Sequence, residues 1–229
     1  MTLRVVVLGL RAGEMTLTPD ADRYVTRVHR LGVGARVDGF DPDAEVEAEG
    51  TLVGIRPARV RFARPQRTAR RPDVETRLIQ AVGKGTKLDT VVRAATELGV
   101  THIVLAVAAR SVKRGAAAAR YERIAREAAR QCGRGDVPHL VAEVPLAEAW
   151  AHGEGQCILL DARGPSVGAT LAHGRAVTFA VGPEGGWTDD EREAARAAGY
   201  TPARLGPFTM RTETVAAAAL GARWATFRE

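Results

Sequence analysis

The sequence predicts an α/β protein with a mainly parallel sheet, preceded by a small β-barrel domain. From about residue 73 onward, short apolar runs alternate with segments of helical periodicity. This alternation is typical of a parallel sheet covered by helices on both faces, because a crossover between parallel strands usually carries a helix. Before residue 73, the apolar runs are separated mainly by turn residues, which favours a compact antiparallel barrel. We therefore expect two domains, residues 1–72 and 73–229.

The composition is that of a globular protein, with 229 residues of which 45% are hydrophobic. No apolar run approaches the roughly 18 residues of a membrane span. Residues 1–10 are apolar but lack a signal-peptide cleavage site, so a strand is expected there. Cys132 and Cys157 are the two cysteines, which predicts no disulfide framework and a reducing, cytoplasmic location. The five histidines occur singly, so no metal site is predicted.

The expected barrel is built from short apolar runs between Asp-, Gly- and Pro-rich turns. A helix is expected at 20–30, with Arg23, Arg27 and Arg30 at three- and four-residue steps along it. Such a stripe is typical of a solvated helix face, unless other basic segments accompany it. The five runs expected to form strands are 3–10, 35–40, 44–48, 51–55 and 58–62.

The basic residues point to a polyanionic partner. The net charge is +6, and because the chain has three lysines among its 33 basic residues, the other 30 are arginines. Seven arginines lie between residues 56 and 71 without one acidic residue. Unpaired guanidinium groups favour phosphate contact over a solvated surface. Prolines 57, 65 and 72 interrupt this run, so its later part is interpreted as an interdomain linker.

The second domain reads as strands and helices in alternation. The helix at 88–98 has apolar residues at helical spacing and ends at Gly99. The other expected helices are 120–132, 146–150, 189–198 and 214–227, and the expected strands are 78–82, 103–108, 157–160, 177–181 and 203–205.

Two glycine-containing loops follow strands of this domain. Gly-Pro-Glu-Gly-Gly at 182–186 comes after an apolar strand and before a capping box, Thr188 to Glu191, that opens a helix. The loop at 205–211 repeats the strand–loop–helix order. Glycine lets a ligand approach bare backbone, and ligands bind at the carboxyl ends of parallel strands. One such loop is as readily an ordinary turn, but two close together favour a ligand site. Neither matches a P-loop or a dinucleotide fingerprint.

Several ordered motifs together resemble the RsmE family of ribosomal RNA uridine methyltransferases, within the SPOUT superfamily. The resemblance covers nearly the whole chain. It implies a SPOUT trefoil knot in residues 73–229, a PUA-like RNA-binding barrel in residues 1–72, a homodimer, and S-adenosyl-L-methionine as methyl donor to N3 of a uridine in 16S ribosomal RNA. The knot follows from the resemblance alone, since knots are essentially absent from folds in general. The motifs are 182–186, 205–214, 84–89, 96–100, 131–134 with 137–138, and 27–31.

The chemistry of methyl transfer, the charge pattern and, for the cofactor, the resemblance together predict which residues form the site. The uridine N3 must lose a proton to attack, so Arg211 is expected to stabilise the anion, and Glu213 to orient Arg211 or to cap the helix with Thr212. A purely structural role for Glu213 stays open, because a carboxylate is favourable in a first helical turn. The cofactor is expected on Val181, Gly182, Pro183, Glu184, Gly185, Gly186, Leu205, Gly206, Pro207, Met210 and Thr212, and RNA on Arg23, Arg27, Arg30, Arg59, Arg61, Arg64 and Arg67.

Some features leave alternatives open. Residue 208 is Phe where the family usually has Arg, and residue 130 is Arg where Glu is common, which leaves the target nucleotide unsettled. Trp187 fits either base stacking or a structural cap. The alanine-rich final helix packs either in its own core or, as we favour, in a homodimer. The alternative functions are a SPOUT methyltransferase for another RNA nucleotide and a non-enzymatic RNA-binding ribosome-assembly factor.

Overall fold

The computed structural model describes residues 2–83, 87–111, 118–172 and 174–225. The chain forms two units, Met1–Arg71 with Arg126–Val137, and Pro72–Ala125 with Pro138–Glu229. The second half of the long helix α3 (Ala118–Cys132) and the turn after it therefore pack with the first unit. Part of the 84–89 motif and the end of the expected final helix lie outside the described residues.

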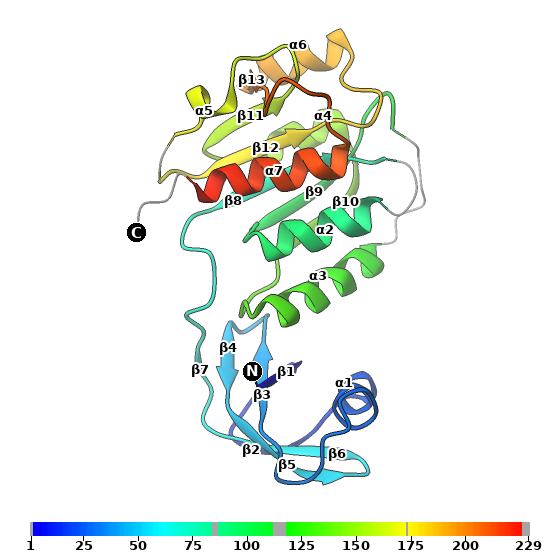
Figure 1. Cartoon of the computed structure of the whole chain (residues 1–229), viewed down its shortest axis with the longest axis vertical. Helices are drawn as coiled ribbons and strands as arrows, with labels where there is room; N and C mark the ends of the chain where they lie inside the picture. The colour runs from blue at the N-terminus through cyan, green and yellow to red at the C-terminus, as the bar shows by residue number, and fades with distance from the viewer. Residues whose placement is uncertain (1, 84–86, 112–117, 173, 226–229) are drawn as a thin grey trace. The chain divides into compact units, whose positions relative to one another are not determined.

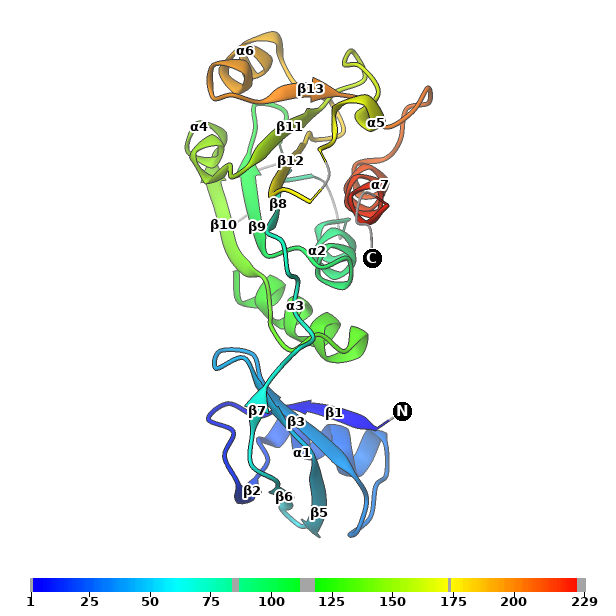
Figure 2. The same cartoon turned by 90° about the vertical axis from the view of Figure 1, so that its left-hand side faces the viewer.

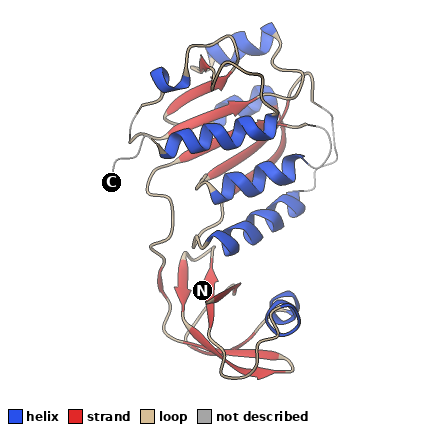
Figure 3. Ribbon diagram, in the orientation of Figure 1, coloured by secondary structure: helices blue, strands red, loops and turns tan. Residues whose placement is uncertain are grey.

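The first unit consists of two small sheets and a short helical segment (Figures 1 and 3). The alternation of β6 is clear, because Ala58, Val60 and Phe62 are buried while Arg59 and Arg61 are exposed. Strand β1 runs parallel to β3, and the other pairs of this unit are antiparallel. One sheet has the order β1 (Leu3–Val6), β3 (Val37–Asp41), β4 (Val46–Ala48), β7 (Gln66–Arg67), and the other β2 (Gly13–Thr16), β6 (Ala58–Phe62), β5 (Gly50–Ile55).

The expected helix at 20–30 is divided into two parts. Helix α1 (Pro19–Arg23) begins at Thr18, whose side chain accepts a hydrogen bond from the amide of Ala21, and is followed by a π-helical turn, η1 (Tyr24–Val28). Val25 is fully buried in the core of the unit with Leu52 and Val60. The π-helical turn changes which side chains share a face, because its hydrogen bonds span five residues.

The second unit is built on a six-stranded sheet in which every neighbouring pair is parallel, as the sequence predicts. Strand β10 was not expected. Its ladder is interrupted between Val141 and Val144, and Glu143 there has a left-handed backbone (φ 51°). The strand order is β10 (His139–Pro145), β9 (His102–Val107), β8 (Thr76–Ala81), β12 (Val177–Val181), β11 (Gln156–Leu160), β13 (Thr201–Ala203).

Helices cover both faces of this sheet (Figure 2). Helices α2 (Lys87–Glu97) and α7 (Thr212–Trp224) pack side by side on one face. The other face carries α4 (Leu146–Ala149), which continues as a 3₁₀ turn, η2 (Trp150–His152), and α6 (Asp189–Ala197); α5 (Val167–Thr170) is a short additional helix. None of the helices in the described ranges is long and apolar enough to cross a membrane.

Helix α7 buries its small side chains within its own unit. Ala216, Ala219 and Leu220 are each at most 1% exposed, and α7 packs on α2 and β12. This agrees with the alternative in which the alanine-rich helix packs in the core of its own domain. The burial of these residues therefore needs no second subunit, and a homodimer has to be argued from the rest of the helix.

Candidate functional site

The glycine loop after β12 and the loop between β13 and α7 meet near the carboxyl ends of β11 and β12. These strands are neighbours, with Leu160 opposite Val181, so the segments that follow them emerge side by side. Between them and the loop before α7 lies a groove of about 430 Å³. Its lining is Lys87, Leu160, Asp161, Ala162, Val181, Gly182, Pro183, Glu184, Gly186, Trp187, Arg192, Thr209, Met210, Arg211, Thr212 and Val215.

Most of the predicted cofactor residues lie on this groove, and five predicted site residues do not line it. Gly185 turns away, and its carbonyl accepts a hydrogen bond from Arg110. The residues of the predicted set that line the groove are Val181, Gly182, Pro183, Glu184, Gly186, Met210, Arg211 and Thr212, and those that do not are Gly185, Leu205, Gly206, Pro207 and Glu213.

A buried hydrogen-bond chain joins the two loops through β8. The amide nitrogen of Gln80 donates to Thr212 Oγ1 at 3.0 Å, and this hydroxyl donates to the carbonyl of Gly182 at 2.9 Å. Gln80 is fully buried and Thr212 is 7% exposed. Because buried polar groups are costly without partners, the chain fixes the start of α7 against the glycine loop. Sequence reasoning missed Gln80, which lies inside an apolar strand; a polar side chain in such a strand was the available signal.

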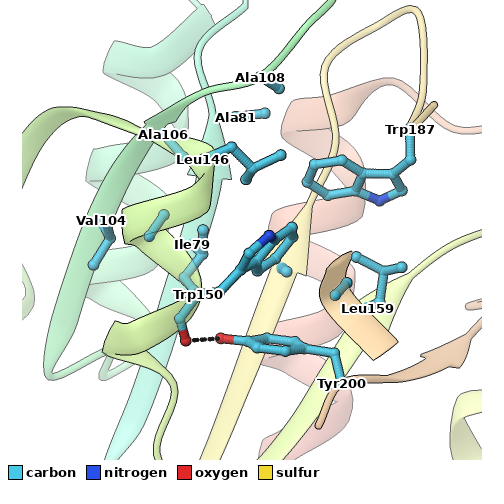
Figure 4. Packing of buried hydrophobic residues seen from close by; sticks show 13 residues of the cluster. Ile79, Ala81, Val104, Ala106, Ala108, Leu146, Trp150, Leu159, Trp187 and Tyr200 are labelled. Carbon is cyan, nitrogen blue, oxygen red and sulfur yellow. Dashed lines mark hydrogen bonds between the residues drawn. The ribbon is translucent and has the colours of Figure 1, made fainter. Parts of the chain in front are cut away.

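Trp187 forms the floor beneath the glycine loop. Its indole nitrogen donates to the carbonyl of Leu160 at 3.1 Å, and its ring lies close to Trp150 in the cluster that also holds Tyr200 (Figure 4). With 3% of its surface exposed, the side chain is packed in the core of its unit, which supports the structural alternative over base stacking. A Cβ at Gly182 would lie 3.1 Å from the indole, a tighter contact than usual, so glycine allows the loop to pack closely on this ring.

The predicted capping box of α6 is confirmed. Thr188 Oγ1 accepts from the amide of Glu191 at 3.2 Å, and the Glu191 carboxylate accepts from the amide of Thr188 at 2.8 Å. The second Glu191 oxygen accepts from the amide of Ala109 at 2.7 Å. One carboxylate thus caps the helix and joins the segment after β9 to it.

A buried ion pair at the groove was not predicted. The Asp161 side chain, 5% exposed, follows β11 directly and accepts a hydrogen bond from Arg192 of α6. This bond raises the pKa of the Arg192 guanidinium, which keeps it charged. An acidic residue immediately after a buried parallel strand was the signal that could have identified Asp161.

The two predicted catalytic residues occupy different environments. Arg211 is exposed, precedes α7 as its N-cap residue, and lines the groove. Glu213 lies in the first turn of α7, and its Oε2 is buried without a hydrogen-bond partner among the described residues. No hydrogen bond or ion pair between the described atoms joins Glu213 to Arg211, so the predicted orienting contact is not formed here. Thr212, expected to help cap the helix, is instead bonded to Gly182.

The groove is bordered by a further ion pair. Lys87 at the start of α2 contacts the carboxylate of Glu184 at 2.8 Å. A Cβ at Gly83 would lie 3.1 Å from the same carboxylate, so the end of β8 also closes around it. The Glu184 carboxylate is therefore held at the border of the groove by residues of its own unit.

The predicted RNA-binding arginines are exposed, yet several are paired. Arg23, Arg27 and Arg30 lie on the helical segment and the turn after it, and Arg64 follows β6. The interpretation of all seven arginines between 56 and 71 as unpaired is wrong. The pairs are Arg59 and Arg61 with Glu14, at 2.5 and 3.7 Å, and Arg67 and Arg71 with Glu45, at 3.3 and 2.6 Å.

Strand register explains these pairs. Strand β2 places Glu14 directly opposite Arg61, and β4 places Val46 opposite Arg67, next to Glu45. The acidic partners are distant in sequence, so a count along the arginine run did not find them. The argument for phosphate contact at this run consequently rests on fewer free guanidinium groups.

Comparison with known proteins places this geometry in a family. The model of the RNA methyltransferase domain matches residues 70–224. A ribosomal RNA small subunit methyltransferase E of Mycobacterium bovis is 33% identical over 159 residues, which cover 63% of this chain. The chain spans 61% of the length of that curated relative.

Two solved structures are similar over almost the whole chain. A methyltransferase of Legionella pneumophila in complex with bound SAM superposes with a TM-score of 0.90 at 27% identity, covering 98% of each chain. The ribosomal RNA small subunit methyltransferase E of Neisseria gonorrhoeae, bound to S-adenosyl methionine, has a TM-score of 0.89 at 27% identity, again with 98% of each chain covered.

Proposed function

Since the chain belongs to the family of RNA methyltransferase domains, we propose that it transfers a methyl group from S-adenosyl-L-methionine to ribosomal RNA. The Mycobacterium bovis relative and the Neisseria gonorrhoeae structure are both named ribosomal RNA small subunit methyltransferase E, in agreement with the motif resemblance. The observation that carries the proposal is the groove at the ends of β11 and β12, which both predicted loops line.

The residues of the groove fit this cofactor. Its volume, about 430 Å³, lies within the range of small-molecule sites, about 300–1,000 Å³. Gly182 and Gly186 expose backbone, and a Cβ at Gly186 would meet open space. The sulfonium donor, when bound, supplies an already activated methyl group. The backbone at 181–186 and 209–212 would hold it, and Leu205, Gly206 and Pro207 remain proposed contacts as part of the same loop.

The proposed acceptor is N3 of a uridine in 16S ribosomal RNA. An imide nitrogen must lose its proton before it can attack, so a cation beside it lowers the barrier. The proposal assigns this role to Arg211, supported by three observations: it is exposed, it lines the groove, and it precedes the N-terminus of α7, whose dipole also favours an anion. Glu213 has one buried oxygen without a partner among the described residues. We propose that its carboxylate influences the electrostatic potential at the N-terminus of α7.

Further parts of the proposal rest on the resemblance. They are the PUA-like character of the first unit, the trefoil knot of the second and the homodimer. The proposed cytoplasmic location rests instead on the two cysteines, which predict no disulfide framework. The homodimer has a direct test in light scattering at micromolar concentration. A monomer that transfers methyl groups at the full rate would overturn it.

The deciding experiment compares ribosomal RNA from cells with and without the gene by nucleoside mass spectrometry. The expected difference is one 3-methyluridine in 16S ribosomal RNA. A different modified nucleoside would assign the protein to another RNA position. Calorimetry with S-adenosylmethionine addresses the remaining alternative: no binding and no modification would leave an RNA-binding assembly factor. Transfer to purified small subunits and to free RNA then identifies the substrate form.

A further inference from the structure

A second groove lies entirely within the unit formed by Met1–Arg71 and Arg126–Val137. Its volume is about 850 Å³, and its walls come from β1, β3, the helical segment η1 and the end of α3. Two hydrogen bonds fix the α3 side of it, from Arg4 to the carbonyl of Arg134 at 3.0 Å and from the amide of Gly135 to the carbonyl of Arg70 at 2.7 Å. The groove is thus built from segments distant in sequence.

An aromatic and arginine cluster stands in this groove. The guanidinium of Arg130 lies over the ring of Tyr24, 3.9 Å from its centre, and His29 meets the same ring edge-on at 4.5 Å. The π-helical turn causes the second contact, because the amide of His29 bonds to the carbonyl of Tyr24 and brings residues five apart together. His29 is exposed, and Tyr24 and Arg130 are half-buried. Planar groups of this kind are those on which unpaired bases stack.

The charge of the groove is positive. Arg36 and Arg70 are exposed on its walls, and none of the described carboxylates forms an ion pair with either of them or with Arg130. Arg4 differs, because it is 7% exposed and is engaged by Glu47 at 3.1 Å. Asp38 is the carboxylate of the lining. Burial is the main cause that raises its pKa and Glu49 adds to this rise, while Arg4 and Arg70 oppose it. Two unpaired arginines beside a stacking cluster match the two parts of a nucleotide, phosphate and base.

We propose that this groove binds an unpaired segment of the RNA substrate, with a base stacked on the Tyr24–His29–Arg130 cluster and its phosphates on Arg36 and Arg70. The proposal takes the RNA substrate from the proposed function and assigns it a second contact site. Single-stranded RNA is favoured over duplex, because base faces are accessible only where bases are unstacked. A carboxylate at position 130 would repel phosphate and could not stack in this way, so Arg130 makes the contact a property of this chain.

The test measures binding of a short unstructured oligoribonucleotide and of an RNA duplex by fluorescence anisotropy, without cofactor. Arg36→Gln and Arg70→Gln should weaken single-strand binding and each reduce the salt slope by about 0.7. Arg130→Lys keeps the charge but loses the plane, so it should weaken single-strand binding about fivefold or more, with the slope unchanged. Arg11→Gln is the matched control, an exposed arginine of the same unit outside the groove.

A second measurement identifies the base contact directly. RNA containing 5-iodouridine should form photo-crosslinks to Tyr24 or His29, located by mass spectrometry. This readout uses the unaltered protein and so does not depend on any variant folding. Crosslinks confined to other regions, or single-strand binding by Arg36→Gln, Arg70→Gln and Arg130→Lys equal to that of Arg11→Gln, would overturn the proposal.

The outcome is separable from that of the proposed function. The groove variants could lose RNA affinity while the protein neither binds S-adenosylmethionine nor modifies RNA. This result would overturn the methyltransferase proposal and support the groove proposal. Methyl transfer with unchanged RNA affinity in all three groove variants would overturn the groove proposal and support the methyltransferase proposal.

Discussion

The hydroxyl of Thr212 donates a 2.9 Å hydrogen bond to the carbonyl of Gly182, 30 residues earlier in the chain. This bond joins the first residue of α7 to the glycine loop after β12, and Gln80 supports it from β8. The positions of the two loops are therefore coupled, and a change at one should be felt by a ligand held between them.

Thr212→Val should remove the hydrogen bonds of the Thr212 hydroxyl and keep the packing of the side chain, because valine has nearly the same volume and no hydroxyl. The change leaves the Gln80 amide and the Gly182 carbonyl without this partner, and we expect a loss of about 1–3 kcal/mol in unfolding free energy. Cofactor affinity measured by calorimetry should fall as well. Thr214→Val, on the exposed side of the same helical turn, is the control and should change neither quantity. Equal behaviour of the two variants would show that the bond is dispensable.

Gly182→Ala should reduce cofactor affinity more than its single methyl group suggests. The added Cβ would approach the Trp187 ring to 3.1 Å, and this ring is held by Trp150 and by its bond to Leu160. The glycine loop must therefore move. Gly168→Ala provides the comparison, because its Cβ would meet only one atom within 4 Å, at 3.9 Å. Calorimetric titration with S-adenosylmethionine checks both; unchanged affinity in Gly182→Ala would mean that the backbone here does not contact the cofactor.

Arg211→Ala should lower the methyl-transfer rate by about 100-fold or more, the scale of losing one stabilising group in a closed site. Cofactor affinity should change little, because the contacts of this loop to cofactor are expected to be mainly through backbone. Arg211→Lys should recover only part of the rate, since a point charge places its donors differently from a planar fork. Single-turnover kinetics provide the measurement, with Arg196→Ala, an exposed arginine of α6, as control. A normal rate in the alanine variant would make Arg211 structural.

His102 should make the fold less stable as the pH falls. Burial lowers its pKa below the ordinary 6.5, and Arg77 lowers it further; Glu75 opposes this, while His139 and His152 add to the lowering. Below about pH 6.5 the unfolded chain takes up a proton that the folded chain resists, so stability present at pH 7–8 is lost as the pH decreases. Thermal unfolding from pH 8 to pH 5 should show a smaller loss in His102→Gln than in the wild type or in His29→Gln. Parallel curves for all three would contradict the prediction.

Local patterns in the sequence were sufficient for much of this structure. The short apolar run at 58–62 between turn residues identified β6, and the capping box at Thr188 located the start of α6. Strand β10 escaped because its break at Glu143 interrupts the period on which strand prediction depends. Strand β7 has two residues, too few for any pattern.

The site was predictable where its residues are contiguous and not where the topology assembles them. The glycine loop at 182–186 was found from its own composition. Gln80 lies on β8 and Asp161 directly follows β11, and the strand order β8-β12-β11 brings Asp161 to the groove and Gln80 to the groove residue Thr212. In the same way, Glu14 reaches the arginine run through strand register, which no count along the chain could reveal.

The central pairing of the parallel sheet has a consequence for how the protein is made. Strand β12 lies between β8 and β11, with Val177 opposite Thr76. During synthesis, the edge of β8 that pairs with β12 therefore stays open until most of the chain has left the ribosome. Pairing between segments so far apart in the sequence is slow, because the chain loses the entropy of loop closure before the contact contributes favourable free energy. We expect refolding in vitro to be limited by this step and sensitive to protein concentration, since partly formed sheets expose edges that associate.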